Sequence, residues 1–143
     1  MFEISIQSPF KYKPDYYNNC DADIAMELFK LIDWVQLYQT ILASGDCPEN
    51  PYYYYEVKRK NSLGEEEMIC ISCMVGTNVC VGYFRPKPVQ KRGLFKTKEV
   101  LDPKFQTQLD DVDINFATGC LEAFLKGNTA YLENNLYDKE ELT

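Results

Sequence analysis

Apolar residues recur at helical spacing in two stretches of the chain. The first covers about 22–43, where they lie alternately four and three positions apart: Ile24, Leu28, Leu31, Val35, Tyr38 and Leu42. The second covers about 111–126, where they lie four apart: Val112, Phe116, Cys120 and Phe124. The pattern predicts two main helices and a short last helix that begins at Thr129. A break in the first helix near Asp33 is compatible with it but not required.

Carboxylates stand just before both main helices. We expect Asp21 or Asp23 to cap the first helix, and one of Asp110, Asp111 and Asp113 to begin the second. Three carboxylates within four residues are also ligands that Mg²⁺ or Ca²⁺ accepts. The spaced ligands and central glycine of an EF-hand are absent, however. The favoured interpretation is therefore helix capping, with no metal site.

Alternating and short apolar runs predict strands. Residues 2–7 alternate strictly, and a turn-rich connector with several tyrosines, prolines and asparagines follows them. Three runs separated by turn sequences predict an antiparallel meander: 52–60, 66–75 and 79–85. The last two are apolar on both faces, which is typical of the centre of a covered sheet. Pro86 and Pro88 are expected to interrupt regular pairing, and 94–101 adds a fourth strand at the sheet edge.

These elements predict an α+β fold. We expect an antiparallel three- to four-stranded sheet packed against two main helices, in the order β-α-β-β-β-(β)-α-α. The length of 143 residues suits a single globular domain, 1–143, with a frayed acidic tail at 138–143. A secretory signal pattern is absent from the N-terminal residues, and no run approaches the roughly 20 apolar residues that span a bilayer. We therefore expect a cytoplasmic location and no membrane contact.

Charge is distributed unevenly along the chain. The whole sequence has 15 basic and 22 acidic residues, yet the segment 85–98 has six basic residues and no acidic one. The rest of the chain, with 9 basic and 22 acidic residues, therefore carries a charge of -13. The basic segment is interpreted as a solvated loop or edge segment, or as a secondary partner contact through Lys87, Lys91 and Arg92. The acidic remainder argues against direct binding of nucleic acid.

Histidine is absent from the chain, which excludes several chemistries. Ser-His-Asp and Cys-His nucleophile systems, zinc sites that contain histidine and histidine pH switches all require it.

Cys70 and Cys73 have metal-motif spacing, but on a strand residues three apart point to opposite faces. The six cysteines are expected to be mostly reduced and buried: Cys20, Cys47, Cys70, Cys73, Cys80 and Cys120. No phosphate-binding loop occurs. We predict no catalytic residue and no cofactor.

Tyrosine clusters and carboxylates suggest binding rather than catalysis. Tyrosine combines a large apolar ring with a polar tip and recurs at binding surfaces. The residues predicted to contact a partner are Asp21, Asp23, Glu27, Asp33, Tyr16, Tyr17, Tyr52 and Tyr54.

In general character the chain resembles two classes of small acidic proteins without catalytic apparatus. One is the bacterial immunity proteins, which neutralise a cognate toxin by binding it. The other is the phage-encoded inhibitors of host defence proteins. The resemblance implies an inhibitor that binds a basic partner, such as a toxin or nuclease domain, with charge complementarity speeding association.

Two alternatives belong to other classes. A carboxylate-based enzyme or small-ligand domain would need a deep pocket with at least two ionisable groups of shifted pKa. An accessory subunit would associate with other chains, for example as a homodimer through the sheet. The sequence leaves monomer and homodimer both open.

Overall fold

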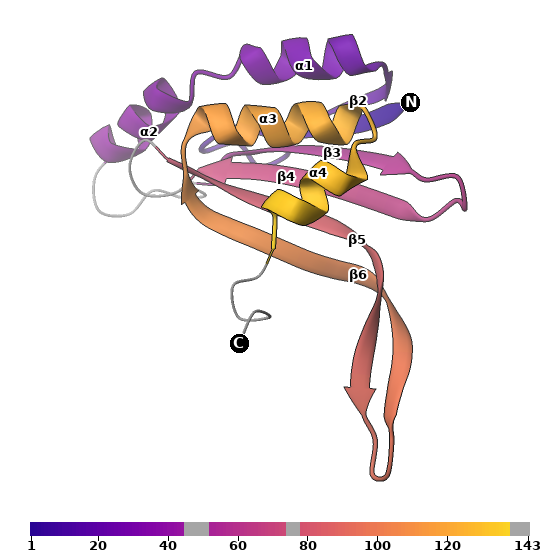
Figure 1. The fold of residues 1–143 in the computed structure, drawn as a ribbon. Helices are drawn as coiled ribbons and strands as arrows, with labels where there is room; N and C mark the ends of the chain where they lie inside the picture. The colour runs from indigo at the N-terminus through magenta and orange to yellow at the C-terminus, as the bar shows by residue number, and fades with distance from the viewer. Residues whose placement is uncertain (45–51, 74–77, 138–143) are drawn as a thin grey trace.

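The computed structural model of the chain describes residues 1–44, 52–73 and 78–137. These residues form one antiparallel sheet of six strands in the order β2-β1-β3-β4-β5-β6, with helices over one of its faces (Figure 1). The strands are β1 Phe2–Gln7, β2 Asp15–Cys20, β3 Tyr54–Lys60, β4 Glu66–Cys73, β5 Val79–Arg92 and β6 Thr97–Val112. The helices are α1 Ala22–Lys30, α2 Trp34–Ala43, α3 Ile114–Leu125 and α4 Thr129–Asn135.

The α+β class is confirmed, but the predicted architecture is wrong. The described residues contain six strands and four helices, where a sheet of three to four strands and two main helices were expected. The predicted order β-α-β-β-β-(β)-α-α is also wrong, because the tyrosine-rich connector contains β2 and the first long helix is divided into α1 and α2. Cys47, residues 74–75 and the expected tail at 138–143 lie outside the described residues.

Aspartates define the starts of the helices. The side chain of Asp21 accepts a hydrogen bond from the Ile24 amide at 2.8 Å, and that of Asp113 accepts one from the Phe116 amide at 2.8 Å. Asp33 accepts one from the Gln36 amide at 3.0 Å. An N-cap residue has a non-helical backbone, so Asp33 separates α1 from α2. The capping interpretation of Asp21 and Asp113 is confirmed.

The core lies between the sheet and the helices. Alternate strand residues point toward α1 and α3, and all of them are fully buried: Tyr55, Val57, Ile69, Ile71, Val81 and Tyr83. The Tyr55 hydroxyl donates to the Ala25 carbonyl of α1 at 2.5 Å, and that of Tyr53 donates to the Trp34 carbonyl of α2 at 3.3 Å. Two tyrosines of the run 52–55 therefore attach the sheet to its helices, and Tyr54 between them points to the other face.

The second face of the sheet has no helix over it in the described part of the chain (Figure 1). Register aligns Lys58 with Met68 and Met68 with Phe84 across three strands, and all three side chains are half-buried. We call this the open face.

The strands β5 and β6 continue past the sheet as a two-stranded hairpin, residues 86–103, which we call the arm (Figure 1). The expectation that Pro86 and Pro88 interrupt pairing is wrong, because β5 runs through both. Arg85 pairs with Phe105 and Lys87 with Asp102, so one residue on β5 lies opposite two on β6. Such a bulge bends a strand and accommodates proline. The arm leaves the body of the sheet at this bulge.

Candidate interaction surfaces

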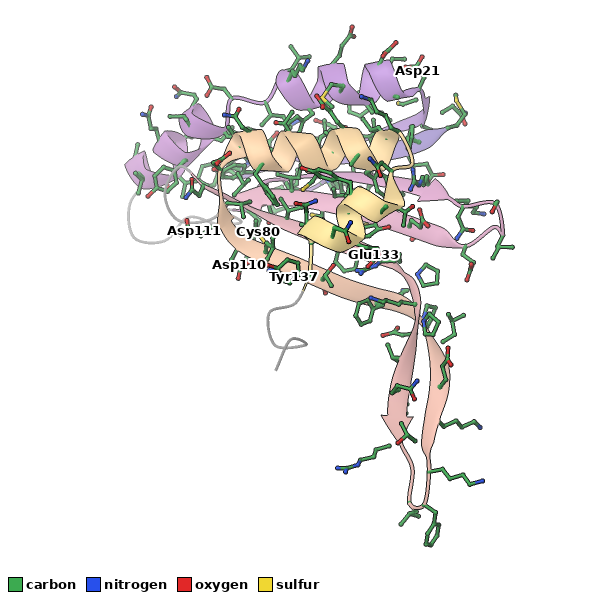
Figure 2. All side chains as sticks on the ribbon, in the orientation of Figure 1. Asp21, Cys80, Asp110, Asp111, Glu133 and Tyr137 are labelled. Atoms are coloured by element: carbon green, nitrogen blue, oxygen red, sulfur yellow. The ribbon has the colours of Figure 1, made fainter. Side chains whose placement is uncertain are left out.

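The strand β2 and the helix that follows it form an exposed acidic surface. We call it the β2–α1 surface, and its members are Tyr16, Tyr17, Asp21, Asp23 and Glu27. β2 is an edge strand, and five of its six residues are exposed. Tyr16 is 70% exposed and Tyr17 38%. Figure 2 shows Asp21 at the start of α1. The structure thus places five of the eight predicted partner-contact residues on two consecutive elements.

The local backbone explains why this surface is exposed. The outer edge of β2 has no neighbouring strand in the described part of the chain, so its backbone groups there are open to pairing. Asn19 has a positive φ of 56°, a conformation that asparagine tolerates, just before the chain enters α1. Asp23 then lies in the first turn of α1 and Glu27 one turn later, both exposed.

The other three predicted residues lie elsewhere. Asp33 caps α2, and together with Tyr54 it lines a shallow pocket next to Trp34. Tyr52 precedes β3 and is 73% exposed. Because β1 lies between β2 and β3, the structure does not join Tyr54 to the β2–α1 surface.

The base of the arm is a partly buried ionic network around the buried Arg85. Arg85 donates to both carboxylate oxygens of Glu133 at 2.8 Å and to the Thr107 hydroxyl at 2.7 Å. Its guanidinium lies over the rings of Tyr83 and Phe105, 4.5 and 4.8 Å from their centres. Burial alone would raise the pKa of Glu133, but the hydrogen bonds and charge of Arg85 hold that pKa below its ordinary value. Glu133 lies on α4 beside the arm (Figure 2).

The three basic residues predicted as a secondary contact differ from one another. Lys87 is half-buried, lies 3.5 Å from Glu133 and 5.0 Å from the centre of the Phe105 ring, and so belongs to the base network. Lys91 and Arg92 are exposed near the tip of the arm. Only these two are placed for contact with another molecule.

The tip of the arm carries two residues that the sequence prediction did not single out as contacts. Leu94 is 95% exposed and Phe95 96% exposed. A signal was present in the sequence, because an apolar pair stands in the middle of six basic residues where a solvated loop needs none.

A groove lies on the open face where the arm begins. Its volume is about 710 Å³, and its lining consists of Glu56, Lys58, Glu65, Glu66, Met68, Phe84, Pro86, Pro103 and Lys104. Lys58 lies 3.9 Å from Glu56. Burial raises the pKa of Glu56, and the neighbouring charge of Glu66 raises it further, although Lys58 opposes the shift.

The aspartates before α3 each have a structural partner. Asp110 accepts hydrogen bonds from Gln108 at 2.8 Å and from the Cys80 thiol at 3.1 Å, which hold the pKa of Asp110 below its ordinary value. Asp111 accepts one from Asn78 at 2.8 Å. Cys80, Asp110 and Asp111 lie together at the end of the sheet remote from the arm (Figure 2). Within residues 1–44, 52–73 and 78–137, no group of three or more His, Cys, Asp or Glu residues is placed to hold a metal ion.

The cysteines in the described part of the chain are free thiols wherever their side chains are placed: Cys20, Cys70, Cys80 and Cys120. Burial raises the pKa of Cys70, Cys80 and Cys120 to about 12, and for Cys80 the bond to Asp110 adds to the shift. These three thiols are protonated at neutral pH, which makes them poor nucleophiles.

Comparison with known proteins gives no relative. No protein-family model, curated protein or solved structure matches the chain. A membrane-spanning helix is not found among the described residues.

Proposed function

We propose that this protein is a binding protein that inhibits a basic protein partner, in the manner of a bacterial immunity protein that neutralises its toxin. The β2–α1 surface would make the contact. One observation carries the proposal: an exposed edge strand and the first turns of the helix that follows it hold two exposed tyrosines and three exposed carboxylates.

Each part of this surface suits a different part of binding. Tyr16 and Tyr17 offer aromatic area with polar tips, which is the composition of binding hot spots. Asp23 and Glu27 are exposed carboxylates that would steer a basic partner toward the surface. The free edge of β2 also offers backbone groups to which a partner strand can pair. A toxin domain that binds nucleic acid presents a basic surface of the required charge.

Free thiols are typical of proteins in a reducing compartment, so we propose that the protein binds its partner in the cytoplasm. The protonated thiols favour binding over cysteine-based catalysis. A phage-type inhibitor of a host defence protein would use the same surface chemistry, and the identity of the partner distinguishes it from an immunity protein.

The test is co-purification of the tagged protein from its native host at low salt, followed by elution with rising salt. We expect a basic protein to be captured and released by salt, because exposed charges attract less strongly as screening increases. Recovery of no protein partner at any salt concentration would contradict the proposal.

Matched charge variants then locate the contact. The variant Asp23→Asn/Glu27→Gln removes two charges from the β2–α1 surface without touching the cap at Asp21. The control Glu99→Gln/Asp102→Asn removes two charges from the arm. We expect the association rate to fall about tenfold at low salt in the first variant and to change little in the second. Equal effects of the two variants would show that the β2–α1 surface is not the contact.

A further inference from the structure

The tip of the arm presents apolar side chains in a defined hairpin. The Gly93 amide donates to the Lys96 carbonyl at 2.9 Å and so closes the turn. Leu94 and Phe95 stand within that turn, almost fully exposed. Their nearest charged neighbours along the chain are all basic and exposed: Lys91, Arg92, Lys96 and Lys98. A well-formed arm that ends in an exposed apolar pair indicates a contact that buries the pair.

The arm and the body of the chain have opposite charges. The arm, 86–103, holds five basic and two acidic residues, which leaves 10 basic and 20 acidic residues on the rest of the chain. At the rise of about 3.3 Å per strand residue, the tip lies roughly 20–25 Å beyond the bulge at Pro86. Since the arm points away from the body (Figure 1), its tip does not reach the acidic surface of its own chain. A second copy offers the same surface within reach.

The groove at the base of the arm matches the tip in chemistry. Met68, Phe84 and Pro86 give it an apolar lining for Leu94 and Phe95. Glu65 and Glu66 line it as well and would face the basic residues of the tip. Two lysines of the lining, Lys58 and Lys104, have the same sign of charge as the tip. Lys58 lies 3.9 Å from Glu56, and the three glutamates of the lining outnumber the two lysines.

The positions of groove and tip match a twofold axis. The groove lies at the base of the arm, because Pro86 and Pro103 line it, and Leu94 and Phe95 lie at the opposite end. When two arms lie antiparallel, each tip comes to the base of the other arm. A single rotation then makes both contacts, as in an isologous dimer. The arm and the groove together offer a contact of the standard size, about 20–30 residues a side.

We propose that two copies of this chain form a dimer by exchanging arms, each seating Leu94 and Phe95 in the groove lined by Met68, Phe84 and Pro86 of the other. A second copy is favoured over nucleic acid or an anionic membrane because its groove offers apolar residues to the pair Leu94 and Phe95 and glutamates to the basic residues beside them. The dimer goes beyond the proposed function and does not depend on it. It uses the arm and the open face over β3 to β6, and it leaves the helix α1 on the other face of the sheet accessible.

The first experiment measures association by sedimentation velocity between about 1 and 100 μM protein, a range over which a dimer of micromolar Kd forms. We expect the wild type to dimerise and the Leu94→Ser/Phe95→Ser variant to have its Kd raised about a hundredfold, since two apolar side chains per arm lose their burial. The control is Tyr12→Ser, which alters a side chain that is 91% exposed in the β1–β2 connection and should leave Kd unchanged.

The second experiment exchanges charges between tip and groove. The groove variant Glu65→Lys/Glu66→Lys and the tip variant Lys91→Glu/Arg92→Glu/Lys96→Glu should each be folded by circular dichroism and monomeric, because tip and groove then have the same sign. When the two are mixed, each tip meets a groove of opposite charge. Native mass spectrometry should therefore show the mixed dimer and neither homodimer.

Three results would overturn the proposal. One is a wild type that stays monomeric at 100 μM. Another is a dimer whose Kd does not respond to the Leu94→Ser/Phe95→Ser substitution. The third is a monomer whose tip is instead required for binding to duplex DNA or to vesicles of anionic phospholipid, which would assign the arm to that ligand. None of these measurements involves the partner of the β2–α1 surface, so this proposal and the proposed function fail separately.

Discussion

The two edges of the sheet hold charge in different ways. At the β2 edge the carboxylates are on the surface, and their contacts are local, such as the 3.2 Å pair of Lys11 with Asp15 and the cap at Asp21. At the β5–β6 edge the charge begins in the interior, where Arg85 is 4% exposed and bonded to Glu133 and Thr107. The other basic residues of this edge are exposed on the arm, whose tip lies roughly 20–25 Å beyond the bulge at Pro86.

The difference separates charges that stabilise the fold from charges available to another molecule. The basic segment 85–98 is continuous in sequence, but the structure divides it near the bulge. Arg85 and Lys87 hold the arm to α4, while Lys91 and Arg92 face solvent. On the β2 edge nearly all the charged side chains are exposed and available to another molecule. Substitution of Arg85 or Lys87 should therefore lower the stability of the fold. Substitution of Lys91, Arg92 or most charges of the β2 edge should change binding and leave stability nearly unchanged.

The largest effect is expected at the base of the arm. Arg85→Met removes both hydrogen bonds to Glu133, which keeps only the more distant Lys87 at 3.5 Å, and it leaves Thr107 without the Arg85 donor. Loss of one partner from a buried pair costs 3–5 kcal/mol, and since the Glu133 side chain is 32% exposed we expect the lower end, about 3 kcal/mol. The control, Arg92→Met, should change the free energy of unfolding by less than about 0.5 kcal/mol. Urea denaturation measures both. Equal, small changes would contradict the division of the basic segment.

The pH dependence of the same network should be the next largest effect. Because the pKa of Glu133 is lowered in the folded state, the network stabilises the protein fully above the ordinary carboxyl pKa of about 4.3 and loses this contribution as pH falls through the folded value. The difference in free energy of unfolding between wild type and Glu133→Gln should therefore shrink from pH 5.5 to pH 3.5. In an Arg85→Met background the effect of Glu133→Gln on the free energy of unfolding should depend much less on pH. If the pH dependence were unchanged in that background, it would come from groups other than the Arg85–Glu133 pair.

The predictable parts of the fold were those with a strong local pattern. The apolar repeat of α3 and the caps at Asp21 and Asp113 follow from helical spacing and from the amides that an aspartate can accept. The break at Asp33 was less visible, since the apolar stripe runs on through it. Only the cap geometry separates α1 from α2.

The parts that could not be predicted depend on contacts that sequence does not show. β2 has five exposed residues of six and thus no alternation, because an edge strand at this position needs no buried face. In the arm, Pro86 alone predicts an interruption of strand pairing. The structure places Pro86 at a bulge, and a bulge or a two-stranded ribbon leaves backbone positions that donate no hydrogen bond to a neighbouring strand. The groove joins residues of β3, β4, β5 and β6, which only the strand register brings together.

A moderate effect on stability is expected at one position of the β2–α1 surface. Asp21→Ala removes the N-cap of α1 and should cost about 1 kcal/mol, whereas Asp21→Asn keeps an acceptor for the Ile24 amide and should cost little. Asp23→Ala should also stay within about 0.5 kcal/mol. Thermal or urea unfolding compares the three. If Asp23→Ala were as costly as Asp21→Ala, the charges of this edge would be structural, and the contrast with the base of the arm would be lost.

The smallest effect should come from a hydroxyl beside the base network. Tyr83 lies under the Arg85 guanidinium, and among the described residues its buried hydroxyl has no hydrogen-bond partner. Burial raises the pKa of Tyr83 to about 12, so the hydroxyl is neutral at ordinary pH. Tyr83→Phe keeps the ring under Arg85 and removes only this unpaired group. We expect a change in stability near zero or slightly favourable.

The matched control is Tyr55→Phe, which removes the bond to the Ala25 carbonyl and should cost about 0.5–1.5 kcal/mol. A loss at Tyr83 as large as that at Tyr55 would mean that the Tyr83 hydroxyl has a partner in solution. The network at the base of the arm would then extend beyond Arg85, Glu133 and Thr107.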